Sequence, residues 1–282
     1  MRAIRYFTKK QVLSEFTANL HLFLIMRAVN IRTDIEDGPL SDMKASFRKN
    51  WTFYLQEALG LGLFMISACF FGGLLESGHS FLHHALPSAL VRRMIMGLMM
   101  GSTALFIFYS PLTAPSGSHI NPAVTLTFYR LGKMGGWDSL FYILFQCLGG
   151  LIAVYLMALC MGETLTSAPV NYVVTVPGPK GPLIAAFTEL LIAFCMIFMV
   201  LYTSSHVNLK KYTRIFSACL VCLYVILTVP LSGFGMNPAR SLASALPAHI
   251  YTAFWIYLSM PVMGMLLAAE LFLRTGKKTP TP

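Results

Sequence analysis

Charged residues are scarce in this sequence. They make up 11% of its 282 residues, whereas hydrophobic residues make up 56%. A soluble domain usually carries about a quarter charged residues, so the composition excludes a soluble globular protein. Roughly 20 consecutive apolar residues span a bilayer as a helix. Six stretches are long enough and predict an all-α, multi-pass membrane protein: about 52–74, 91–111, 138–161, 182–204, 213–231 and 250–273.

Arrangements of side chains that would support catalysis or bind a cofactor are also missing. The six cysteines all fall in apolar stretches, which favours a packing role over disulfides or metal ligands. His79, His83 and His84 have a spacing that could hold a metal ion, but a solvated loop is the favoured interpretation. No nucleophile and base at a suitable spacing and no phosphate-binding loop occur, so we expect no enzyme and no cofactor.

Acidic residues are few: 11 Asp and Glu stand against 21 Lys and Arg. If the N-terminus is cytoplasmic, six spans return the C-terminus to that side, which then holds 17 of the 21 basic residues. The opposite side keeps Arg92, Arg93 and Lys180. This is the positive-inside bias of membrane proteins. A nucleic-acid partner is not expected, because no basic face with a groove or stacking residues is indicated.

The N-terminus has no cleavable signal pattern. Residues 1–50 are expected to form a cytoplasmic segment, and residues 276–282 a cytoplasmic tail. The apolar run over about 16–29 is interrupted by polar residues and is too short to span. It predicts either an amphipathic helix on the membrane surface or a segment that binds a partner.

One motif occurs twice. Residues 116–126 read SGSHINPAVTL and residues 232–242 read SGFGMNPARSL. Asparagine is a preferred N-cap, and proline is favoured at the first helical position. The motifs therefore predict two short helices, which begin at Asn121-Pro122-Ala123 and at Asn237-Pro238-Ala239. The apolar pieces that follow, about 122–129 and 238–246, are too short to cross a membrane alone.

The duplication extends beyond the motif. Glu57 and Glu189 each lie early in their half of the chain. Three spans and one short helix occur in each half of the chain, 51–161 and 181–275. Because the number of spans per half is odd, the second half must have the opposite orientation in the membrane. The glutamates could carry protons, but we favour acceptors that hold the backbone before each short helix.

Two short helices that enter from opposite faces would meet N-terminus to N-terminus near the midplane. The positive ends of their dipoles oppose cations, and the two asparagine amides are donors that can orient water. The residues before each asparagine are small or glycine-rich and are expected to run extended, with carbonyls along a wet lumen. They are Gly117, Ser118, His119, Gly233 and Gly235.

These motifs resemble the aquaporin (major intrinsic protein) family, bacterial type, over about residues 50–275. The resemblance implies six spanning helices with two re-entrant half-helices, a homotetramer in the cell membrane, and one pore per subunit. It also implies a narrow extracellular filter formed by the second helix, the fifth helix and the second loop. We therefore expect a passive channel in the lipid bilayer for water and small neutral solutes, which excludes protons and ions.

By the same resemblance, Arg240 is the filter arginine, Phe234 is the loop residue, and Val225 stands where water-selective relatives have His. Counting from the first motif leaves Met100 and Gly101 as alternatives for the second helix. The missing His suggests a glycerol or small-polyol facilitator, whereas Ser241 and Ala245 match water channels. A proton-coupled transporter and a structural membrane protein are the alternatives from other classes.

Overall fold

The computed structural model describes residues 39–275; residues 1–38 and 276–282 lie outside that description. The helix expected over about 16–29 and the expected cytoplasmic tail therefore fall outside the described residues. Between residues 39 and 275 every regular element is a helix. The all-α fold class that the sequence predicts is confirmed for this part of the chain.

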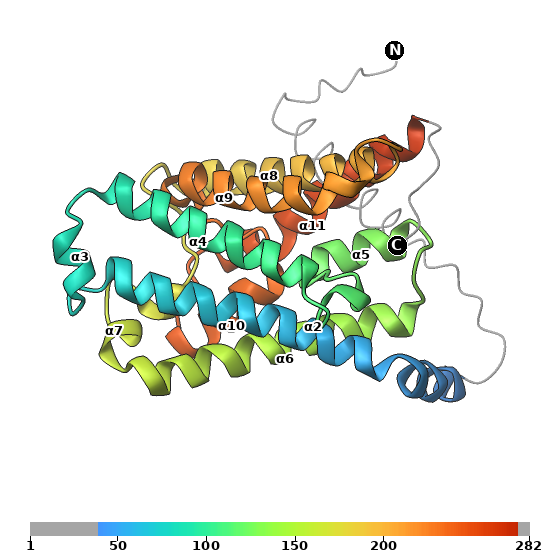
Figure 1. Ribbon diagram of the computed structural model, residues 1–282, viewed down its shortest axis with the longest axis horizontal. Coiled ribbons are helices and arrows are strands. Elements are labelled where there is room, and N and C mark those ends of the chain that lie inside the picture. Colours follow the sequence, from blue (N-terminus) through green and yellow to red (C-terminus); the bar gives the residue numbers. More distant parts are fainter. Residues whose placement is uncertain (1–38, 276–282) are drawn as a thin grey trace, which may run out of the picture. The chain divides into compact units, whose positions relative to one another are not determined.

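Within residues 39–275, six helices are long and apolar enough to cross a membrane, as expected. They are α2 (Pro39–Glu76), α4 (Ala89–Tyr109), α6 (Gly136–Met161), α8 (Pro182–Ser204), α9 (Thr213–Ser232) and α11 (Phe254–Arg274). Two shorter helices follow the repeated motifs, α5 (Pro122–Arg130) and α10 (Pro238–Ala248), and Figure 1 shows them among the long ones. The connections hold α3 (Phe81–Ala85), α7 (Glu163–Thr166) and the 3₁₀ turns η1 (Ala114–Ser116), η2 (Asn171–Val173) and η3 (Lys210–Tyr212).

Helix α2 begins well before the apolar stretch that predicts it. Ser46, Asn50 and Tyr54 recur at intervals of four residues and so share one face of the helix. All three donate to Oδ1 of Asp138 at the start of α6, with Asn50 at 2.9 Å and Tyr54 at 2.6 Å. Phe47 packs beside them on Phe141, with ring centroids 5.2 Å apart. These contacts extend the helix beyond its membrane-length core.

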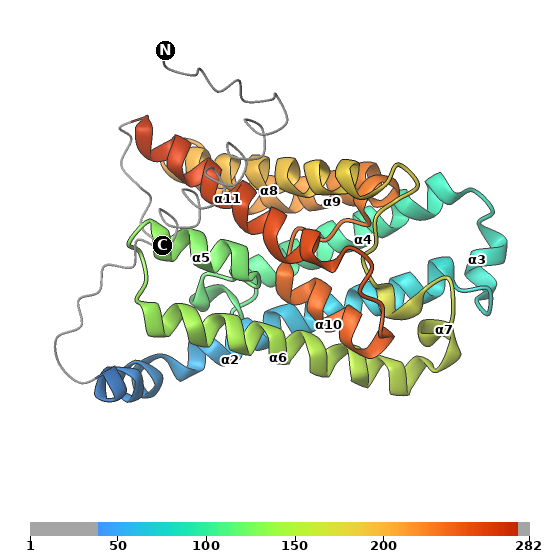
Figure 2. The ribbon, with the colours of Figure 1, turned by 180° about the vertical axis from the view of Figure 1, so that it is seen from behind.

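The two repeats pack across one another. Helix α5 of the first repeat contacts α11 of the second, and α10 of the second contacts α6 of the first. Figure 2 shows both short helices between α6 and α11. Helix α4 packs on α9, and α8 packs on both α9 and α11. Each short helix is therefore held by the last long helix of the opposite repeat.

A glycine allows close helix packing at the same place in each repeat. A Cβ added at Gly149 of α6 would lie 2.1 Å from the Ala58 carbonyl oxygen, and one added at Gly264 of α11 would lie 2.2 Å from that of Leu190. Ala58 and Leu190 directly follow the two glutamates that the sequence singled out. Only a residue without a side chain permits this approach of helix to backbone.

Among the residues that the structure describes, no three histidines, cysteines or acidic residues gather where they could hold a metal ion. All six cysteines are free; Cys69 is buried, Cys147 and Cys222 are half-buried, and Cys160, Cys195 and Cys219 are exposed. The sequence suggests that all six cysteines pack inside the protein, but three of them are exposed on the surface of the single chain. His83 and His84 lie in α3 rather than in a loop, and their rings bond to the carbonyls of Leu75 and Gly78 at 2.9 Å.

Candidate functional site

The two asparagines of the repeated motif cap the short helices. Asn121 has extended backbone angles, and its Oδ1 accepts from the Ala123 N–H at 2.9 Å. Asn237 is also extended, and its Oδ1 accepts from the N–H groups of Ala239 at 3.0 Å and Arg240 at 3.2 Å. Pro122 and Pro238 occupy the first helical positions, where their missing N–H is not needed. Both helices therefore start where the sequence predicts.

The caps also join the two repeats. Nδ2 of Asn121 donates to the Met236 carbonyl at 2.8 Å, and Nδ2 of Asn237 donates to the Ile120 carbonyl at 2.7 Å. Each asparagine thus binds the residue that precedes the other. An amide nitrogen has two N–H groups. No second acceptor for either nitrogen occurs within residues 39–275, so one donor per asparagine stays available to a solute.

The loops before the asparagines share an unusual backbone. Gly117 and Gly233 are left-handed, with φ of 87° and 76°. Positive φ recurs at four further positions of the two loops: Ser118, Ile120, Phe234 and Met236. The sequence led us to expect extended segments, and this expectation is wrong for these residues. Non-glycine residues with positive φ are strained, so the surroundings must hold them.

Buried carboxylates hold the two loops. Both glutamate side chains are fully buried. Glu57 accepts from Ser116 Oγ at 2.7 Å and from the His119 and Ile120 N–H groups at 2.9 and 2.6 Å. In the second repeat, Glu189 accepts from the matching groups: Ser232 Oγ at 2.6 Å, the Gly235 N–H at 2.9 Å, and the Met236 N–H. Each carboxylate thereby restrains the backbone directly before its asparagine.

Sequence reasoning missed three partners in this support. The hydroxyl of Tyr142 donates to the Ser116 carbonyl at 2.8 Å, and that of Tyr257 donates to the Ser232 carbonyl at 2.7 Å. Gln146 donates to Glu57 at 2.7 Å in the first repeat only, because proline stands at the matching position, Pro261. The two tyrosines could have been found by aligning the third spans of the two halves.

A cavity of about 710 Å³ lies beside the paired asparagines. Both asparagines line it, as do most of the loop residues that the sequence assigned to a lumen: Gly117, Ser118, His119, Phe234 and Gly235. Gly233 is not among the lining residues. A Cβ added there would lie 2.9 Å from the Val176 carbonyl oxygen, so the chain after α7 covers it.

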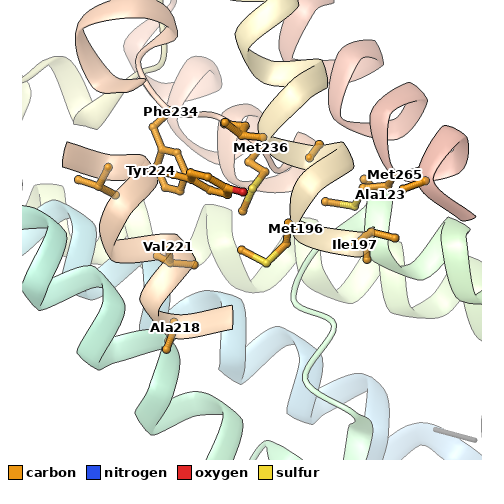
Figure 3. Close-up of a cluster of buried hydrophobic side chains, with 14 of the residues drawn as sticks. Ala123, Met196, Ile197, Ala218, Val221, Tyr224, Phe234, Met236 and Met265 are labelled. Atoms are coloured by element: carbon orange, nitrogen blue, oxygen red, sulfur yellow. The ribbon is translucent and has the colours of Figure 1, made fainter. Parts of the chain in front are cut away.

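Of the residues that the sequence assigned to the filter, Phe234 lines this cavity; the others, Met100, Gly101, Val225 and Arg240, do not. Met100, Val225 and Phe234 belong to one buried apolar cluster. Figure 3 shows part of that cluster, with Phe234 and Tyr224 beside Met236. Gly101 packs directly on α9: a Cβ there would lie 2.9 Å from Cβ of Cys222 and 3.0 Å from the Ala218 carbonyl oxygen. Helix α9 thus fills the space that a lumen would need at Gly101.

Arg240 lies in the first turn of α10 and is 8% exposed. Its buried Nη1 has no hydrogen-bond partner among the residues that the structure describes. The chain after α7 docks nearby: Thr175 donates to Ser241 Oγ at 3.0 Å, and the Gly178 N–H donates to the Leu231 carbonyl at 3.1 Å. No motif in the sequence predicts these contacts. A buried guanidinium with an unused donor is suited to a polar solute.

Comparisons with known proteins agree with this arrangement. A family model described as "Major intrinsic protein" matches residues 2–272, a range that includes the N-terminal segment left out of the resemblance above. A probable NIP-type aquaporin from Nicotiana alata is 33% identical over 56% of this chain and 57% of its own length. The probable aquaporin NIP7-1 from Arabidopsis thaliana is 28% identical over 80% of this chain and 77% of its own.

Among solved structures, the aquaglyceroporin from Plasmodium falciparum has a similar fold. The TM-score is 0.64, and the match covers 79% of this chain and 95% of that one at 20% identity. At this identity the similarity concerns the fold alone. The match to the Nicotiana relative spans little more than half of that protein's length. No comparison distinguishes a bacterial type, which stays a prediction.

Proposed function

Since the chain belongs to the major intrinsic protein family, we propose that it forms a passive transmembrane channel for water and small uncharged solutes. The observation that carries the proposal is the reciprocal contact of Asn121 and Asn237 with the Met236 and Ile120 carbonyls. It joins the starts of α5 and α10 beside a cavity. Both plant relatives described above bear the name aquaporin, which favours the same function.

The paired helix starts supply the selectivity against charge. Each helix N-terminus carries a partial positive charge of roughly half an elementary charge, so two of them together oppose a cation. The free N–H on each asparagine can bind the oxygen of a passing water. A water held by both amides cannot relay a proton along a file of waters, which would exclude protons as well as ions.

The solute range depends on four side chains proposed as the filter: Met100, Val225, Phe234 and Arg240. Of the two alternatives on the second helix we propose Met100, because Gly101 packs against α9. Three apolar side chains and one arginine suit a solute that has both a carbon chain and polar groups. Water and glycerol-sized solutes are therefore both proposed to pass, with a glycerol or small-polyol facilitator of little water selectivity as the alternative.

The assembly and its place in the cell are part of the proposal. Residues 51–275 form the channel domain, and the segments 1–50 and 276–282 lie in the cytoplasm. Four copies assemble, each with its own pore, in the cell membrane. The skewed distribution of basic residues supports this orientation, and membership of the family supports the tetramer.

A proton-coupled transporter is the main alternative from another class. It would need membrane-embedded carboxylates that are free to exchange protons. Glu57 and Glu189 instead accept hydrogen bonds from backbone N–H groups on both oxygens. Glu270 is paired with Arg130 at the end of α5. These contacts favour passive conduction over coupled transport.

Osmotic measurements on liposomes test the proposal. Vesicles that contain the protein are mixed in a stopped-flow instrument with sucrose, and then with glycerol. We expect fast shrinkage with a low activation energy, and faster re-swelling in glycerol than in vesicles without protein. Protein-dependent acceleration by a proton or sodium gradient, or rates equal to those of empty vesicles, would sink the proposal.

A further inference from the structure

The cavity beside the asparagines has a basic mouth. Lys210, Lys211 and Arg214 line it together with Thr213, Ser217 and Val221. Four of these residues lie on α9: Thr213 and Arg214 in its first turn, Ser217 one turn later and Val221 one turn after that. With a rise of about 1.5 Å per residue, the lining runs roughly 10 Å along the helix from Arg214 to Val221. We call Lys210, Lys211 and Arg214 the basic mouth.

Nothing in the described residues neutralises this mouth. No aspartate or glutamate lines the cavity, and none of the three basic side chains forms an ion pair within residues 42–275. Two of them lie over aromatic rings instead. The Arg214 guanidinium is 5.3 Å from the ring centroid of Tyr109, and Lys211 Nζ is 4.9 Å from that of Tyr212. The donors that these groups carry remain available to a ligand.

The local backbone adds to the positive field. Helix α9 begins at Thr213 with no side-chain capping bond and no acidic residue in its first turn. The N-terminal end of a helix dipole is partly positive and favours an anion. This end lies at the same mouth, so two independent sources of positive potential meet there. Lysine binds as a point charge, and arginine offers paired N–H donors that fit the oxygens of a phosphate.

We propose that the basic mouth binds a phosphate group, and that the bound anion obstructs the way into the cavity. The obstruction rests on the proposed channel function; the binding does not. The phosphate could belong to a free or metabolite-borne anion in the cytoplasm or to the headgroup of an anionic lipid. A cation is excluded as the ligand by the three like charges.

Binding is tested first on the purified full-length protein in a neutral detergent, by equilibrium dialysis with radiolabelled inorganic phosphate. We expect saturable binding that weakens as chloride is raised, because salt screens exposed charges. In the Lys210→Gln/Lys211→Gln/Arg214→Gln variant the affinity should fall by about tenfold or more, since each charge-assisted hydrogen bond contributes on that scale. The control Lys133→Gln/Lys180→Gln/Arg274→Gln removes the same charge away from the cavity and should bind like the parent. Equal binding by both variants overturns the site.

Flux is then measured in vesicles of zwitterionic lipid with phosphate or with an iso-osmolar neutral sugar on both sides. Phosphate should slow water flux through the parent and the control, but not through the mouth variant. A second arm replaces part of the lipid with phosphatidylglycerol, without phosphate. If water flux in this arm is slower through the parent and the control but not through the mouth variant, the lipid headgroup is the source of the bound phosphate. Phosphate binding without any effect on flux in either arm overturns the obstruction. Absence of flux in every condition, with binding intact, contradicts the channel function instead.

Discussion

Individual side chains decide what could pass the proposed filter. Met100, Val225 and Phe234 present apolar surface in one buried cluster. Arg240 brings the only charge among the four, and its Nη1 has no partner in the described part of the chain. A pocket that hydrogen-bonds its solute discriminates more sharply than one that differs in apolar bulk. Changes of polarity at these positions should therefore alter selectivity more than changes of size do.

Val225→His tests this expectation. Histidine adds a polar donor and narrows the constriction, so glycerol permeability should fall by about tenfold or more while water permeability changes much less. Stopped-flow shrinkage in sucrose and re-swelling in glycerol measure the two rates on the same vesicles. Val225→Ile is the control, because it enlarges the side chain without adding a polar group. An unchanged glycerol-to-water ratio in Val225→His would mean that Val225 lies outside the filter.

The adjacent residues Met100 and Gly101 should respond differently to phenylalanine. Met100→Phe should leave the protein folded and reduce flux per molecule, because the ring enlarges a side chain of the filter cluster. Gly101→Phe should reduce the amount of folded protein, since even a Cβ would lie 2.9 Å from Cys222. Overpacking of this kind typically costs about 1–3 kcal/mol. Thermal unfolding in detergent together with flux per molecule separates the two effects; a folded Gly101→Phe protein with reduced flux would reverse the assignment.

Residues in the repeated motif could be read from the sequence because their chemistry is local. Asparagine is a preferred N-cap and proline is favoured at the first helical position, so the pair indicates a helix start from local chemistry alone. Tyr142, Tyr257 and Gln146 were not found, since each acts through a contact with a distant segment. The proposal of Met100 rather than Gly101 also drew on the structure, because it rests on the face of α4 that packs against α9.

Among the elements, the loops before the asparagines depend most on long-range support. Each has positive φ at two non-glycine residues, and each is held by a carboxylate from the first helix of its repeat. Apolar periodicity predicts long helices well, but it carries no information about left-handed loop residues. For the same reason, the early start of α2 was missed: it depends on the polar contacts with Asp138 rather than on hydrophobicity.

Glu57→Gln and Glu189→Gln test the support of these loops. A glutamine has one acceptor oxygen and turns its NH₂ towards backbone N–H donors, so at least one of them loses its partner. Each unsatisfied buried donor costs about 1–3 kcal/mol. We expect a lower unfolding temperature in detergent for each variant, and reduced flux without any new dependence on pH gradients. Glu270→Gln is the control, because a half-exposed ion pair contributes only about 0–1 kcal/mol. A Glu57→Gln protein as stable as the control would contradict the supporting role.

At the scale of the whole molecule, the inverted repeat was predictable from counting. Each half has three spans, and this odd number gives the second half the opposite orientation in the membrane. In the structure, each short helix packs on the last long helix of the other half. The packing partners themselves could not be derived, because they depend on contacts such as the glycine approach of Gly149 to Ala58 and of Gly264 to Leu190. Small residues that allow such approaches are common in membrane proteins and mark no particular partner.

The orientation in the membrane remains a prediction from charge, and labelling can test it. With 17 basic residues on one side and three on the other, the richer side should face the cytoplasm. Cysteines are introduced singly at Lys278, near the C-terminus, and at Lys180, which is exposed between α7 and α8. An impermeant thiol reagent applied to intact cells should label Lys180→Cys and not Lys278→Cys, relative to the parent with its own six cysteines. After permeabilisation both should react. Labelling of Lys278→Cys alone from outside would reverse the topology, and the basic mouth would then face the exterior, where cytoplasmic phosphate could not reach it.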